Sequence, residues 1–137
     1  MEAGKRMNGK SKTFPFVRTY KNLSEVLTDH KLASLGDAYV NFVYALVLSN
    51  KRRVPSGAKV KGSILAEAIK KAALREFLPS KMERHSLADA AEALIVYAWL
   101  HNIVALEESV SVLEKFDNPV EGFSQLLMEI KSKIRFS

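Results

Sequence analysis

Three acidic residues lie in apolar segments, where a carboxylate is costly to bury. Asp37 falls within LASLGDAYVNFVYALV, and Asp89 and Glu92 fall within SLADAAEALIVYAWL. An unpaired ionised carboxylate in an apolar helix is unstable, so each acid predicts a partner, such as a cation, a hydrogen-bond donor or a metal. Asp89 and Glu92 are three residues apart and therefore share one helix face. With Asp37 from a neighbouring helix they would offer several oxygens to one hard divalent cation, which predicts a Mg²⁺ site.

Purely structural roles would explain the same three acids. Asp89 completes an S-x-x-D pattern that resembles a capping box, and the helix dipole favours an acid in the first turn. Glu92 would then pair with an arginine, and Asp37 would form a salt bridge with Lys61 or Arg84. The chain has no cysteine, so any metal would be held by oxygen or imidazole ligands.

Composition favours one ordinary globular domain. The chain has 137 residues, of which 47% are apolar, and no uninterrupted apolar run of about 18 residues. The polar, basic beginning lacks the apolar stretch of a secretory signal. We therefore expect a protein without a membrane partner and, because cysteine is absent, a cytoplasmic location. Residues 1–14 are expected to form a basic flexible arm and residues 15–137 a single helical domain.

The hydrophobic pattern has a helical period throughout and predicts an all-α bundle. We expect helices over 22–29, 32–49, 61–78, 86–102, 107–116 and 119–135, the last one capped by Asn118 with Pro119 in its first turn. The helix over 32–49 is apolar nearly all round, which predicts a central buried helix, and the helix over 86–102 is predicted to be the second. The side chains expected to point inward from the first of these are Leu32, Leu35, Tyr39, Phe42, Val43 and Leu46.

The net charge of +6 is concentrated in two regions. Residues 1–21 carry six basic residues and one acid, and residues 51–84 carry ten basic residues and three acids. Regional positive charge suits a phosphate backbone, because each contact releases condensed counterions. A solvated helix face with a basic tail would give the same distribution, so charge alone leaves both interpretations open.

Three ordered motifs resemble the ribonuclease III family. LGDA at 35–38 resembles the core of that family's signature helix, and ADAAEALI at 88–95 is similar to its second acidic motif. Between them, VKGSILAE at 60–67 resembles the start of the family's intermediate helix, and the spacing of the two acidic motifs also fits the family.

The resemblance implies a dimerising, all-helical endonuclease domain that hydrolyses double-stranded or structured RNA with bound Mg²⁺, or with Mn²⁺ as a substitute. Asp37 would be the metal ligand of the first motif. Asp89 and Glu92 would bind metal and position water. Metal held by carboxylates suits this chemistry, because it lowers the pKa of water and neutralises the charge that develops on the phosphate.

Two positions depart from the bacterial pattern, which has glutamates seven and four residues before the signature aspartate. This chain has His30 and Ala33 there. The compact Mini-III branch, which lacks an attached RNA-binding domain, also has a small apolar residue at the second position, and LASLGDAYV resembles that branch. His30 would contact a metal, contact a phosphate, or cap and pack at a helix junction.

The chain length leaves no room after residue 102 for a usual double-stranded RNA-binding domain, so we expect the catalytic domain alone to bind RNA. It would recognise the shape of the RNA through the phosphates and 2′-hydroxyls of the RNA backbone. A ribosomal RNA precursor is one candidate substrate. Two alternatives stay open: a catalytically silent RNA-binding or scaffold protein with an incomplete metal site, and a helical protein whose motifs match by chance. The candidate RNA-binding residues are Lys51, Arg52, Arg53, Lys59 and Lys61, supported by Lys70, Lys71 and Arg75.

Overall fold

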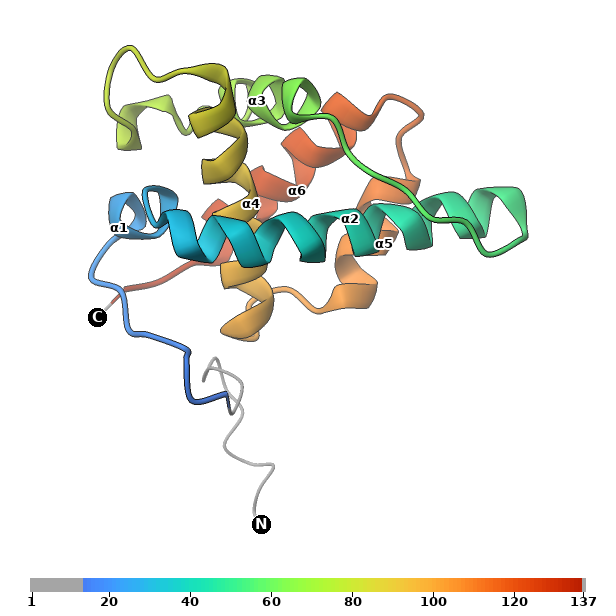
Figure 1. Ribbon diagram of the computed structural model, residues 1–137, viewed down its shortest axis with the longest axis horizontal. Helices are drawn as coiled ribbons and strands as arrows, with labels where there is room; N and C mark the ends of the chain where they lie inside the picture. Colours follow the sequence, from blue (N-terminus) through green and yellow to red (C-terminus); the bar gives the residue numbers. More distant parts are fainter. Residues whose placement is uncertain (1–13, 137) are drawn as a thin grey trace.

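The computed structural model describes residues 14–136, and within them the chain is helical without strands, as predicted (Figure 1). Almost all of the predicted basic arm, residues 1–14, lies outside this part. The elements are α1 (Leu23–Leu27), α2 (His30–Arg52), α3 (Gly62–Lys71), the 3₁₀ turn η1 (Arg75–Phe77), α4 (Arg84–Leu100), α5 (Leu106–Glu114) and α6 (Pro119–Lys133).

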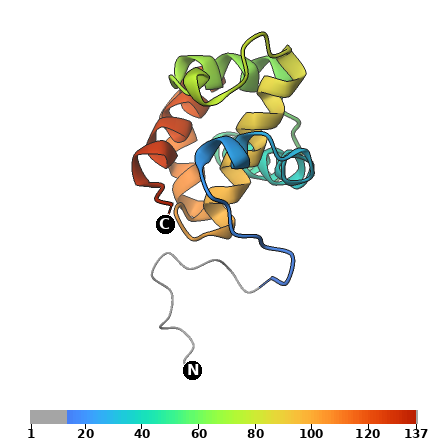
Figure 2. The same cartoon turned by 90° about the vertical axis from the view of Figure 1, so that its left-hand side faces the viewer.

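Helix α4 is the centre of the fold. Twelve of its seventeen residues are buried, and it contacts α1, α2, α3 and α6. In Figure 2, α2 is seen nearly end-on along one side of α4, and α6 lies on the opposite side. A long, almost uncharged helical segment can be covered on all sides only at the middle of a bundle, which is why α4 takes this place.

Helix α2 is not the central buried helix that its sequence predicts. Its buried residues include Leu32, Val40 and Val43, which lie on the side towards α4. Leu35 and Phe42, which were expected to point inward, are 40% and 55% exposed. The prediction was wrong for these two residues because α2 lies at the edge of the bundle, and the described chain leaves both side chains exposed.

By length and composition alone, α2 would be able to cross a membrane. That test is weak, because core helices of soluble proteins also pass it. The packing of α2 against α4 and α5 accounts for one of its apolar faces without a membrane.

Local capping and backbone geometry set the helix boundaries. The Asp29 carboxylate accepts a hydrogen bond from the Leu32 N–H at 3.0 Å, so α2 begins at His30, two residues earlier than expected. The predicted helix over 61–78 is interrupted, because Ala73 has a φ of 60° and the chain continues as η1. Asn118 caps α6 as predicted, through a 2.9 Å hydrogen bond from the Val120 N–H.

Candidate active site

A close approach between α2 and α4 sets the geometry of the acidic residues. A Cβ atom at Gly36 would lie 2.2 Å from the carbonyl oxygen of Glu92, so only glycine allows these two backbones to come so near. Asp37 follows Gly36 on α2, and Glu92 belongs to the α4 turn at the contact. The helix crossing therefore brings carboxyl groups 55 positions apart in the sequence to the same place.

Glu92 is the most perturbed acid of this site. It is 8% exposed, and its pKa is raised from 4.5 to about 8. Burial is the largest cause of this rise; a hydrogen bond to Asp37 and the negative charges of Asp37 and Asp89 contribute to it, and the positive charge of Lys59 opposes it. A carboxyl group with this pKa is mostly protonated at neutral pH, so Glu92 can donate the hydrogen bond to Asp37.

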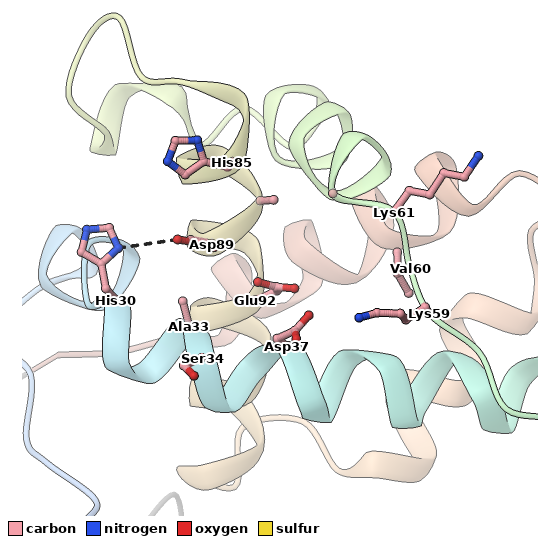
Figure 3. Close-up of a pocket in the computed structure, with 12 residues that line it drawn as sticks. His30, Ala33, Ser34, Asp37, Lys59, Val60, Lys61, His85, Asp89 and Glu92 are labelled. Carbon is pink, nitrogen blue, oxygen red and sulfur yellow. Dashed lines mark ion pairs between the residues drawn. The ribbon is translucent and has the colours of Figure 1, made fainter.

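Asp89 is oriented differently from the other two acids. Its Oδ2 lies 3.6 Å from Nδ1 of His30, at the first residue of α2 (Figure 3). No three histidine, aspartate or glutamate side chains within residues 14–136 are arranged as a ready-made metal-ligand group. The structure thus pairs Asp37 with Glu92 and Asp89 with His30, and the role of the three acids as metal ligands stays a prediction.

The structural alternatives for these acids find little support. Helix α4 begins at Arg84 with Glu83 as its N-cap residue, so Asp89 lies beyond the first turn and does not belong to a capping box. Within the described residues, Asp37 forms no salt bridge with Lys61 or with Arg84. His30 does not pack at the helix junction, because it is exposed and Asp29 provides the cap.

One pocket of about 630 Å³ collects most of the predicted site. The three acids, His30 and Ala33 line it from α2 and α4, and the loop before α3 adds two basic residues. His85 also lines the pocket and was missed from sequence. His85 precedes Asp89 by four residues, so helical spacing alone would have predicted that the two side chains share one face of the helix.

Only two of the eight candidate RNA-binding residues, Lys59 and Lys61, line this pocket. The other six do not line it. Lys51, Arg52 and Arg53 lie at the far end of α2 (Figure 1), and Arg75 lies on η1. Three of the lysines have partners within the chain: Lys51 donates to the Phe116 carbonyl at 3.1 Å, Lys70 lies 3.9 Å from Glu67, and Lys71 lies 2.9 Å from Glu121.

Comparison with known families gives a match over most of the chain. A family model described as Ribonuclease III matches residues 30–134. The match covers α2 to α6, including all three acids and the loop that carries Lys59. No individual curated protein matches the chain.

Proposed function

Because the chain belongs to the ribonuclease III family, we propose that it is a divalent-metal-dependent endoribonuclease acting on double-stranded or structured RNA. Membership of the family supports RNA cleavage in general. Dependence on a divalent metal is inferred from the acidic pocket of this chain. A structured ribosomal RNA precursor is one substrate of the proposed class.

The observation that carries the proposal is the pair of carboxyl groups of Asp37 and Glu92 in the pocket. When a buried carboxyl group retains its proton beside a second carboxylate, a metal cation can replace that proton and bind both groups. The donor set consists of carboxylate oxygens, which suit Mg²⁺ and Mn²⁺. Asp37, Glu92 and Asp89 would hold the metal.

Six residues around the pocket would take part in this chemistry: the three acids, Lys59, Lys61 and His30. A bound divalent cation supplies an activated water and neutralises charge on the phosphate. Lys59 and Lys61 attract the RNA backbone to the pocket, because they place two positive charges at its rim. His30 orients the Asp89 carboxylate through their 3.6 Å contact.

Cleavage of an end-labelled RNA duplex tests the proposal. We expect the wild type to cut with Mg²⁺ or Mn²⁺ but not with EDTA, and Asp37→Asn and Glu92→Gln each to lower the rate by about 100-fold or more. The exposed Glu76→Gln on η1 is the matched control and should cleave at the wild-type rate. Circular dichroism verifies that each variant is folded.

A wild-type protein that binds the duplex but cuts it with neither metal would contradict the proposal. It would favour the silent RNA-binding protein instead, which the replacement of two customary acids by His30 and Ala33 motivates.

We also propose that the protein is a homodimer through the outer face of α2. Leu35 and Phe42 are exposed there, two helical turns apart, and the half-buried Tyr39 and Leu46 continue the same stripe. An apolar stripe of this length on an edge helix favours burial against a second copy.

The oligomeric state tests the proposed interface. Phe42→Ser should shift the protein from dimer to monomer in sedimentation velocity, because Phe42 is the most exposed large apolar residue of α2. Met128→Ser is the control, since Met128 is 46% exposed on α6, away from this stripe, and should leave the dimer intact. A wild type that sediments as a monomer at micromolar concentration would refute this interface.

A further inference from the structure

A proline turn at the beginning of the described chain holds two phenylalanine rings together. The Val17 N–H donates to the Phe14 carbonyl at 3.1 Å, with Pro15 in the second position of the turn. The rings of Phe14 and Phe16 are stacked, with centroids 5.5 Å apart and planes inclined by 16°. Phe14 is 43% exposed and Phe16 is 56% exposed. The turn therefore fixes an apolar surface that remains in contact with water.

This phenylalanine turn continues the apolar stripe on the outer face of α2. Phe14 packs on Trp99, with ring centroids 6.3 Å apart, and Trp99 stacks on Tyr39 of the stripe at 5.2 Å. Figure 1 shows the chain at residues 14–20 below the N-terminal half of α2. Residues 14–16 precede the segment that matches the ribonuclease III family, so the family match does not account for this extension.

A second pocket lies at the C-terminal end of α2. It has a volume of about 650 Å³ and is lined by Leu46, Ser49, Asn50, Arg53, Val54 and Pro55. Its polar side chains have partners within the chain, because the Ser49 hydroxyl accepts from the Ser56 N–H at 2.8 Å. The Asn50 amide likewise donates to the Glu114 carboxylate. The remaining lining consists of three apolar side chains and the Arg53 guanidinium group, and aromatic rings pack favourably on both.

Two-fold symmetry would bring the phenylalanine turn and this second pocket together. Two copies of an edge helix that pack about a perpendicular two-fold axis run antiparallel, so the N-terminal half of one helix faces the C-terminal half of the other. Leu35 and Ser49 lie seven positions on either side of Phe42, about 10 Å along the helix. With Phe42 near the axis, the turn of each copy would lie on the side of the partner's pocket. Each contact would then form twice.

We propose that the phenylalanine turn of each protomer occupies the second pocket of its partner, so that the subunits contact each other beyond both ends of the α2 stripe. This inference rests on the proposed homodimer. The occupant is a second copy because the exposed rings and the pocket belong to the same continuous face, at opposite ends of one helix. The rings are already ordered by the turn, so docking them costs little conformational entropy.

Cross-linking between engineered cysteines gives the first test, because the chain has no cysteine of its own. Phe16→Cys and Val54→Cys are prepared separately, mixed so that subunits exchange, and treated with a short bismaleimide at a concentration where the wild type is a dimer. We expect a cross-linked dimer in the mixture and little with either variant alone, because the contact joins different positions of two copies.

Met128→Cys in place of Val54→Cys is the matched control for the cross-link. Met128 is 46% exposed on α6, away from the second pocket, and its mixture with Phe16→Cys should give little product. A mixture of Phe16→Cys and Val54→Cys that cross-links no more than this control would overturn the proposal.

Sedimentation velocity gives the second test. Phe16→Ser should raise the dimer Kd by about tenfold or more, because two buried rings are lost from each dimer. Thr19→Ala, at an exposed position of the same segment, should leave the Kd unchanged. If Phe42→Ser dissociates the dimer but Phe16→Ser has the wild-type Kd, the α2 interface stands and the role of the phenylalanine turn is refuted. A monomeric wild type would refute both, whereas RNA cleavage is decided independently by the duplex assay.

Discussion

Gly36→Ala should lower the free energy of unfolding by about 3 kcal/mol or more, because the new Cβ would overlap backbone atoms of α4. The nearest atoms are the Glu92 carbonyl oxygen at 2.2 Å and its carbon at 2.5 Å. Backbone atoms cannot rotate away, so α2 must separate from α4. The separation would also move Asp37 from Glu92, and RNA cleavage should fall with stability.

Urea denaturation monitored by circular dichroism measures this effect. Gly57→Ala is the matched control, because nothing lies within 4 Å of a Cβ at that position, and its free energy of unfolding should stay within about 0.5 kcal/mol of the wild type. If Gly36→Ala is as stable as Gly57→Ala, the helices do not approach as closely as the structure indicates.

The helices were largely predictable because their signals are local. The run of small and apolar residues in α4 predicted a buried helix, and Asn118 and Pro119 predicted the beginning of α6. The burial of α2 was not predictable in the same way. An apolar stripe shows that a face needs cover but does not show what covers it, and Phe42 remains 55% exposed within the described residues.

The acids were recognisable as candidate site residues because charge is rare within apolar helices. Their pairing was not, since it depends on contacts between distant segments. Gly36 determines that Asp37 meets Glu92, and the Val60 N–H bond to Asn41 determines that the loop returns to α2. Neither contact leaves a periodic signal in the sequence.

The basic residues illustrate the opposite error, in which neighbours in sequence were grouped although they separate in space. Lys51 and Lys59 are eight positions apart, yet Lys51 binds the Phe116 carbonyl at one end of α2 while Lys59 lines the acidic pocket. A helix of 23 residues carries its end about 20 Å beyond Asp37, so charge density along the chain is a poor guide to a binding surface.

Glu92→Gln should remove a large pH dependence of stability. The pKa of Glu92 is raised from 4.5 to about 8, so between these values the folded protein binds a proton that the unfolded chain has released. The free energy of unfolding of the wild type therefore falls as the pH rises through this range. Glutamine is neutral at every pH, so the variant should show no such fall and should exceed the wild type by about 3 kcal/mol at pH 9.

Urea denaturation at pH 5, 7 and 9 with EDTA measures the difference, and Glu76→Gln, at an exposed position, should follow the wild-type curve. Equal pH dependence in the wild type and Glu92→Gln would show that Glu92 is already ionised in the folded protein.

Metal links this stability effect to the proposed activity. A cation held by Asp37 and Glu92 requires the deprotonated carboxylates, so its binding releases a proton and strengthens as the pH rises towards 8. Saturating Mn²⁺ should therefore restore at pH 9 the stability that the wild type loses without metal, because the ion binds only the folded state. Glu92→Gln should gain little from Mn²⁺, since the carboxylate that the ion would take from the proton is absent. Equal stabilisation of both proteins by Mn²⁺ would mean that the metal binds elsewhere.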